Sequence, residues 1–191
     1  MSPPRRILIQ MSGAPGSGKS TLARNLAQSL NGTVISHDLI RSFFLTNDMA
    51  FEQSARLAYD LQWTLAKDLI EQGQMAIIID STCNYQQTLD QGETLARLHD
   101  YEYSYVECRV DDLDLLDARL QSRVAMRSQR TAVSQSPLDA PILRHGEDSH
   151  ALFQRWIDHP CRPAGNTIIV DSTRCPKDCL DYTMMRLAKL D

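Results

Sequence analysis

Residues 13–20 read Gly13-Ala14-Pro15-Gly16-Ser17-Gly18-Lys19-Ser20: a glycine, four residues and then Gly-Lys-Ser. The residues before this stretch, 7–11 (ILIQM), are a short apolar run that predicts a β-strand. The residues after it, 19–30, carry leucine at helical spacing and predict a helix. This pattern between a strand and a helix is typical of a phosphate-binding loop, whereas a plain glycine-rich turn would not require Lys-Ser at this place.

The chemistry of this loop predicts a nucleoside triphosphate as its ligand. Glycines let the backbone curl with its N–H groups facing inward, and the helix N-terminus adds positive potential. Lys19 would bring a full charge to the β- and γ-phosphates, and the hydroxyl of Ser20 would ligate Mg²⁺. We therefore expect ATP or GTP with Mg²⁺, held by Gly13, Ala14, Pro15, Gly16, Ser17, Gly18, Lys19, Ser20 and Thr21.

The rest of the chain alternates between strand and helix patterns. Four further apolar or alternating runs predict strands, at 33–36, 75–79, 103–110 and 167–170. Helical spacing predicts helices at 39–45, 51–72, 88–99, 113 to about 130, 151–157 and 180–190, and residues 134–146 look irregular. Strands separated by helices predict an α/β fold of the P-loop NTPase type, in which a five-stranded parallel sheet carries helices on both faces.

Two of these segments allow more detailed predictions. The run at 75–79 (MAIII) is continuously apolar and β-branched, which predicts a strand covered on both faces. The longest helical pattern, 51–72, places leucines on one face and ends at Gly73. These leucines are Leu57, Leu61, Leu65 and Leu69.

Length and composition are those of an ordinary globular protein. A chain of 191 residues with 42% hydrophobic residues predicts a single domain over 1–191. The formal charge of -4 argues mildly against broad attachment to nucleic acid or anionic membrane. The sequence shows no signal peptide and no membrane span, and the odd number of cysteines, 5, favours reduced thiols and a cytoplasmic location. Cys175 and Cys179 lack two further ligands at the spacing of a zinc site.

Two aspartates follow predicted strands, where ligands of parallel sheets bind. Asp38 is the candidate general base that takes the proton of an acceptor hydroxyl, with Arg41 one helical turn further on. The alternative is that Asp38 caps the helix 39–45. Asp80 is the candidate second magnesium group, against a simple role at the end of its strand. Ser81, Thr82 and Asn84 are candidates to bind the acceptor, and His37 is interpreted as structural.

Four arginines, Arg119, Arg123, Arg127 and Arg130, are spaced to lie along one side of a helix. Such a row could close over phosphates as a lid at about 119–146 and neutralise charge on the transferring group. Arg123 and Arg127 are the candidates for that contact. The alternative is a solvated helix face paired with the upstream aspartates Asp111, Asp112, Asp114 and Asp117.

Four segments together resemble a known family. GAPGSGKST, SHDLIR, IIIDSTCN and ARLQSRVAMR occur in this order over roughly 7–130. They resemble the P-loop kinases related to the kinase domain of phage-type polynucleotide kinase, with zeta toxins and chloramphenicol phosphotransferase as more distant members. The resemblance implies an ATP-dependent kinase in which Asp38 is the general base and Arg41 contacts the acceptor or its phosphate. It also implies an arginine lid after the fourth strand and a loop at 171–174, with Thr173, beside the adenine.

Two functions from different classes remain open. The first is a kinase that transfers the γ-phosphoryl group of ATP to a hydroxyl, either on a nucleic acid 5′ end or nucleoside, or on a small molecule. The second is a nucleotide-dependent switch or NTP hydrolase that attacks water and acts with a protein partner. Asp38 separates them, because only the first requires a base beside an alcohol. The acceptor and the oligomeric state are left open by the sequence.

Overall fold

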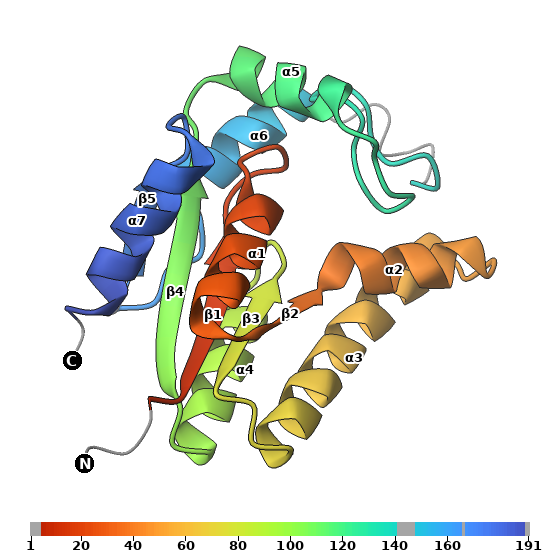
Figure 1. Cartoon of the computed structure of the whole chain (residues 1–191). Coiled ribbons are helices and arrows are strands. Elements are labelled where there is room, and N and C mark those ends of the chain that lie inside the picture. The colour runs from red at the N-terminus through yellow and green to blue at the C-terminus, as the bar shows by residue number, and fades with distance from the viewer. Residues whose placement is uncertain (1–4, 141–147, 166, 190–191) are drawn as a thin grey trace.

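A five-stranded parallel β-sheet runs through the computed structural model, which describes residues 5–140, 148–165 and 167–189. The strand order is β2-β3-β1-β4-β5, so β1 is central (Figure 1). All neighbouring strands pair in parallel, which confirms the predicted sheet. The strands are β1 (Ile7–Ser12), β2 (Thr33–Ser36), β3 (Ala76–Asp80), β4 (Glu102–Arg109) and β5 (Thr167–Asp171).

Helices cover both faces of this sheet, as predicted. Figure 1 shows α1 and α7 on one face of the sheet and α3 and α4 on the other. Side chains alternate along a strand, so Ile7 and Ile9 of β1 pack with α1 and α7, whereas Leu8 packs with α3 and α4. Every residue of β3 is buried, which confirms that this apolar strand is covered on both faces. The helices are α1 (Lys19–Leu30), α2 (His37–Thr46), α3 (Phe51–Glu71), α4 (Gln86–Leu98), α5 (Leu113–Ser122), α6 (Ser149–Asp158) and α7 (Pro176–Leu187).

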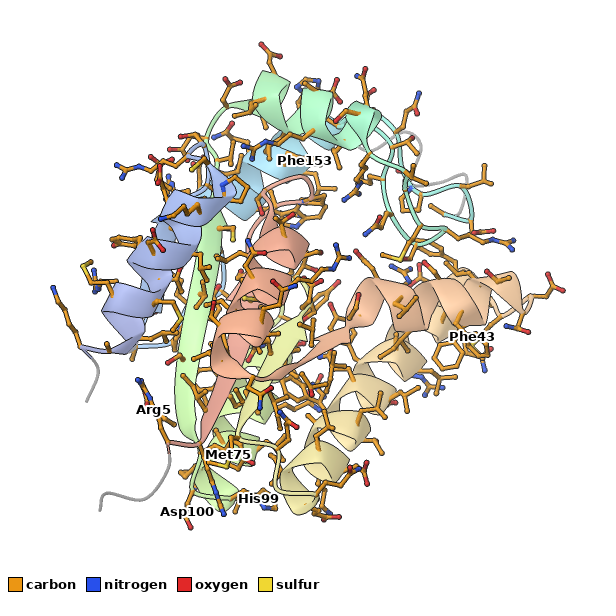
Figure 2. The ribbon with its side chains drawn as sticks, viewed as in Figure 1. Arg5, Phe43, Met75, His99, Asp100 and Phe153 are labelled. Carbon is orange, nitrogen blue, oxygen red and sulfur yellow. The ribbon has the colours of Figure 1, made fainter. Side chains whose placement is uncertain are left out.

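A third apolar cluster lies beyond the carboxyl ends of the strands. Leu116 and Leu120 of α5 pack with Phe153 and Ile157 of α6 and with Ala14 of the glycine loop. Phe153 is fully buried beneath α5 (Figure 2). This cluster fixes α5 and α6 next to the glycine loop. The described chain that follows α5, up to residue 140, then reaches toward α2 (Figure 1).

The leucine pattern of α3 does not mark the buried face of this helix. The buried positions of this helix are Phe51, Ser54, Ala58, Gln62, Ala66 and Ile70, whereas Leu61 and Leu65 are 37% and 38% exposed. Small side chains lie at the contact because α3 packs against α2, α4 and the sheet at once. Leucine spacing therefore identified the helix but not the side that faces the core.

The helix predicted from 113 to about 130 is also too long. α5 ends at Ser122, and Arg123 is extended, with φ -90 and ψ 153. The chain then turns, and the Gln129 N–H donates to the Met126 carbonyl at 2.8 Å. It leaves the helix because Ser128 is buried against Ser42 of α2, a contact that a continuous helix could not reach. Residues 141–146 of the expected lid lie outside the described residues.

Of the helices within the described ranges, none combines the length and the apolar character needed to cross a bilayer.

Candidate active site

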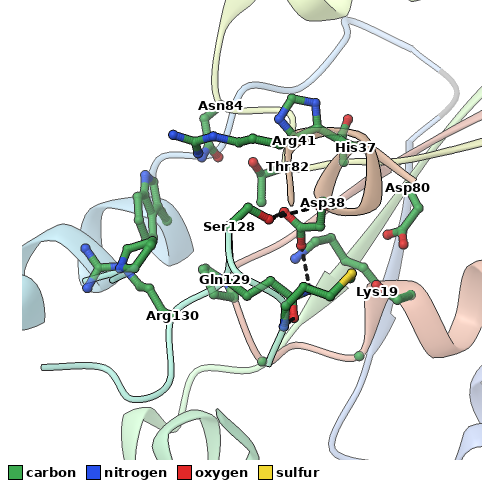
Figure 3. Close-up of a pocket in the computed structure, with 18 of the residues that line it drawn as sticks. Lys19, His37, Asp38, Arg41, Asp80, Thr82, Asn84, Ser128, Gln129 and Arg130 are labelled. Carbon is green, nitrogen blue, oxygen red and sulfur yellow. Dashed lines mark hydrogen bonds between the residues drawn. The ribbon is translucent and has the colours of Figure 1, made fainter. Parts of the chain in front are cut away.

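A cleft of about 1370 Å³ opens at the carboxyl ends of the strands, between α2 and α3 on one side and α6 with the segment after α5 on the other (Figure 3). Most residues singled out from the sequence line it. These are Pro15, Gly16, Gly18, Lys19, Ser20, Thr21, Asp38, Arg41, Asp80, Ser81, Thr82, Asn84, Arg119, Arg123 and Arg130. The predicted residues Gly13, Ala14, Ser17, Arg127 and Thr173 are not among the described residues that line it.

The glycine loop folds tightly between β1 and α1. Gly13 has φ +128, and a Cβ atom there would lie 2.3 Å from the carbonyl oxygen of Cys108. Gly18 is the N-cap of α1 with φ 92, a left-handed conformation that glycine adopts without strain. The loop can therefore curl as predicted only because these two positions lack side chains.

Lys19 points into the mouth of this loop. Its Nζ donates to the carbonyl oxygens of Gly13 at 2.8 Å and Ala14 at 2.9 Å. Burial lowers the pKa of Lys19, while the nearby carboxylates of Asp80 and Asp38 oppose that shift. The buried hydroxyl of Ser17 has no partner among the described residues. A buried ammonium and a free hydroxyl donor in one loop fit a phosphate group, which offers only acceptor oxygens.

Asp80 and Ser20 lie together at the floor of the cleft. Asp80 ends β3 and is only 7% exposed. Burial raises the pKa of Asp80, and a hydrogen bond from Ser20 and the charge of Lys19 oppose this. A carboxylate and a hydroxyl are oxygen ligands of the kind that Mg²⁺ takes, alongside waters and phosphates. These two residues therefore fit the predicted metal position.

Asp38 lies in the first turn of α2 and does not cap the helix. The N-cap is Ser36, whose hydroxyl accepts from the Leu39 N–H at 3.4 Å. The helix begins two residues earlier than predicted because Ser36, rather than Asp38, binds its first free N–H groups. The carboxylate of Asp38 accepts a hydrogen bond from Gln129 Nε2 at 2.7 Å and a longer one, 3.4 Å, from Ser128 Oγ.

Arg41 lies one turn after Asp38 and also lines the cleft. Its guanidinium lies 4.1 Å from the centre of the Phe51 ring and donates to the Phe51 carbonyl at 3.3 Å. Figure 3 shows Asp38 between two groups of side chains: Lys19 and Asp80 lie on one side, and Arg41, Thr82 and Asn84 on the other. The carboxylate thus lies between the phosphate loop and a separate polar end of the cleft.

The four arginines do not form one row, because α5 ends before three of them. Arg119 donates to the Ser172 carbonyl at 2.9 Å. Arg123 lines the cleft and donates to the Arg130 carbonyl at 3.0 Å; burial lowers its pKa, and Asp38 opposes that shift. Arg127 lies outside the lining and makes a two-pronged ion pair with Asp139, at 2.7 and 2.9 Å. The partner of Arg127 is therefore downstream, not one of the upstream aspartates.

A comparison with known protein families assigns the chain to one of them. The sequence model of the family AAA_33, described as an AAA domain, matches residues 8–146. The chain belongs to this AAA domain family. The match begins in β1 and includes the phosphate loop, both aspartates and the whole segment from Arg119 to Arg130.

Solved structures similar to this AAA domain protein have a kinase-like P-loop fold. A candidate kinase from Chloroflexus aurantiacus J-10-fl has a TM-score of 0.72 at 18% identity, covering 95% of this chain and 98% of that one. A gluconokinase from Sinorhizobium meliloti 1021 has a TM-score of 0.61 at 16% identity, with 98% and 93% covered. The Mycobacterium tuberculosis APS kinase CysC, in complex with AMPPNP and APS, has a TM-score of 0.60 at 17% identity, with 97% and 99% covered.

The structure of this AAA domain protein also brings into the cleft residues that sequence reasoning missed. Ser128 and Gln129 reach Asp38 from 90 and 91 positions along the chain. No motif or spacing marks them, because they follow a helix end that the sequence did not reveal. His37 was interpreted as structural, yet it lines the cleft as well as packing its ring 4.1 Å from that of Tyr59.

The buried imidazole of His37 predicts a dependence of stability on pH. Burial lowers the pKa of His37 from 6.5 to about 4, with Asp38 opposing the shift and Arg41 adding to it. Between these values the unfolded chain binds a proton that the folded chain does not, so this contribution to stability is complete above pH 6.5 and is lost as the pH falls toward 4. Urea unfolding should show this loss. As the pH falls from 6.5 toward 4, we expect the free energy of unfolding of wild type to decrease relative to that of His37→Phe, by no more than about 1.4 kcal/mol per pH unit. The exposed variant His150→Phe should keep the wild-type slope; a His37→Phe slope equal to that of wild type would contradict the prediction.

Proposed function

We propose that this protein is a kinase that transfers the γ-phosphoryl group of Mg²⁺-ATP to an alcohol. The observation that carries the proposal is the placement of Asp38 in one cleft with Lys19, between the phosphate loop and a second polar end (Figure 3). A hydrolase or switch needs the phosphate loop and the metal ligands, but it needs no carboxylate facing room for a second substrate. The cleft provides that room.

Each residue has a role in this proposal. Lys19 and the loop amides hold the β- and γ-phosphates, and Ser20 and Asp80 hold the metal ion. Bound Mg²⁺-ATP would supply the phosphoryl group and neutralise part of its charge. Asp38 takes the proton of the alcohol while the alcohol oxygen bonds to the γ-phosphorus and the bond to the bridging oxygen of ADP breaks. Arg123, whose Nε is buried without a partner among the described residues, stabilises the charge on the transferring group.

Two of the residues predicted from the sequence, Arg127 and Thr173, are not among the described residues that line the cleft. Arg127 is bound to Asp139 outside the cleft. In the proposed function Arg123 therefore makes the phosphate contact, and Arg127 stabilises the arginine-rich segment, which we propose as a lid. Thr173 hydrogen-bonds to Asp171 outside the cleft, while its neighbours Ser172 and Arg174 line it. The loop at 171–174 therefore stays the proposed neighbour of the adenine.

A small-molecule alcohol is the proposed acceptor class, in a single kinase domain over 1–191. The similarity to the structures of a gluconokinase and an APS kinase favours this class over a nucleic acid end. The formal charge of -4 agrees with it. The resemblance to the kinase domain of phage-type polynucleotide kinase supports the kinase chemistry and keeps a 5′-hydroxyl as the second acceptor to test.

The test is to follow labelled phosphate. The pure protein with γ-labelled ATP, Mg²⁺ and a panel of metabolite alcohols, nucleosides, RNA and DNA is expected to place label on an alcohol. Label found only as free phosphate would favour the hydrolase. Salt separates the acceptor classes, because a polynucleotide would bind far more weakly as salt rises and a small neutral alcohol would not.

A further inference from the structure

We propose that Gln129 is a positioning residue that sets the orientation of the Asp38 carboxylate. The inference rests on the proposed function, in which Asp38 is the general base. It assigns the control of that base to the loop at 123–130 as well as to α2. Gln129 acts through Asp38 and has no proposed contact with the reacting atoms.

The amide of Gln129 is fixed at both ends. Its Oε1 accepts from the Met126 N–H at 3.1 Å, and its Nε2 donates to Asp38 Oδ2 at 2.7 Å. Turning the amide over would place its oxygen against the carboxylate and its NH₂ group against the Met126 N–H, so both contacts would become repulsive. The hydrogen bonds therefore allow one orientation, with the donor facing Asp38.

The loop that carries Gln129 is itself anchored to α2. Ser128 is 6% exposed and Ser42 is 8% exposed. The Ser128 N–H donates to Ser42 Oγ at 3.0 Å, Ser42 Oγ donates to Ser128 Oγ at 2.9 Å, and Ser128 Oγ donates to the Asp38 carbonyl at 3.0 Å. This buried chain of hydrogen bonds holds the loop against the helix turn that bears Asp38. The distance between Gln129 and the carboxylate is thus set by the fold.

Holding one carboxylate oxygen restricts where the other can point. Without the Gln129 donor, the carboxylate of Asp38 would keep only the longer hydrogen bond of 3.4 Å from Ser128 Oγ, so its side chain would be held less firmly in one rotamer in the wide cleft. A base must lie within hydrogen-bond reach of the proton that it takes, and small errors in its position are costly. Arg123 donates to the Arg130 carbonyl at the end of the same loop, so one segment places both the base and the proposed phosphate contact.

The first test is a kinetic cycle with Gln129→Leu, Asp38→Asn and the double variant. In the wild-type background we expect Gln129→Leu to lower kcat by about 10-fold to 100-fold with the KM for ATP unchanged. In the Asp38→Asn background the same change should cost nothing further, because the group that it positions is no longer a base. The matched control is Gln72→Leu, which removes an exposed Gln–Asp hydrogen bond of 2.6 Å at the far end of α3 and should leave kcat unaltered.

Two results would overturn the inference while leaving the proposed function in place. One is an equal loss of kcat from Gln129→Leu with and without Asp38; the other is an unchanged kcat in the single variant. A wild type that phosphorylates no alcohol would remove the proposed function itself. The contact between Gln129 and Asp38 can be tested without any activity. In a ¹⁵N NMR spectrum, the side-chain amide signals of Gln129 should shift when Asp38 is replaced in Asp38→Ala. Unshifted signals would refute the contact.

Discussion

Asp38→Asn is expected to lower kcat for transfer to an alcohol by about 10³-fold, within the range typical of a lost general base. Asparagine has the same shape and can still accept the hydrogen bond from Gln129, so the fold and the loop contact should persist. It cannot take a proton from the alcohol. The dissociation constant for Mg²⁺-ATP should change by less than about 2-fold, because Asp38 has no proposed contact with the phosphates. Steady-state kinetics and calorimetry measure the two effects separately.

A matched variant separates the loss of a base from the loss of any carboxylate. Asp68→Asn alters an exposed aspartate of α3 that is bound to Gln72 and should leave kcat unaltered. If Asp38→Asn kept full alcohol phosphorylation, the assignment of the base would be wrong. If the protein instead hydrolysed ATP at an unchanged slow rate with or without Asp38, the nucleotide-dependent switch would be the better account.

Lys19→Met is expected to lower kcat/KM for ATP by about 10²-fold to 10³-fold, the usual loss when one positioned charge is removed from a phosphate site. Methionine keeps the apolar stem of the lysine and removes its ammonium. The same change should leave the thermal midpoint equal to that of wild type or higher, because burial disfavours the charged form of Lys19 in the free protein. Steady-state kinetics and thermal unfolding measure these two quantities, and calorimetry with Mg²⁺-ATP measures the accompanying loss of affinity.

A loss of activity with ATP without any loss of thermal stability is the result expected of a residue that belongs to a binding site. If Lys19 were needed for the fold, its substitution would lower both the affinity of the protein for the nucleotide and its thermal stability. The control Lys177→Met removes an exposed ammonium paired with Asp181 and should change neither. Unaltered ATP affinity in Lys19→Met would show that the loop does not bind the triphosphate.

The sequence predicted the parts of the molecule that depend on neighbours in the chain. The loop, the strand before it and α1 (Lys19–Leu30) follow from local periodicity and from glycines that the backbone needs at Gly13 and Gly18. The five-stranded sheet follows from apolar runs separated by helices, and its parallel pairing from the crossover rule. The placement of Asp80 at the end of β3 and of Asp38 just after β2 follows in turn.

Features that depend on distant contacts were not predictable in this way. Gln129 meets Asp38 across 91 positions, and the turn that brings it there replaces a helix whose residues have good helical spacing. The exposed Leu61 and Leu65 show the same limit, because the buried side of α3 is chosen by close packing with several neighbours. Tertiary contacts decided both features against the local pattern.

Between β4 and β5 the chain borders the cleft, and its described residues, 110–140 and 148–165, pair with none of the named strands. The isolated bridge between Ala132 and Gln135 lies within this connection. The registers of β1, β3 and β4 are set by the pairing of β1 with its two neighbours in the sheet.

Within this connection α5 packs on the glycine loop and Gln129 binds Asp38, so these parts are constrained. The stretch at 134–138, whose Ser136 and Pro137 line the cleft, is the part that can change in length or composition while the triphosphate cradle stays intact. If the proposed kinase function holds, this stretch is the part to exchange between relatives in order to change which alcohol is phosphorylated.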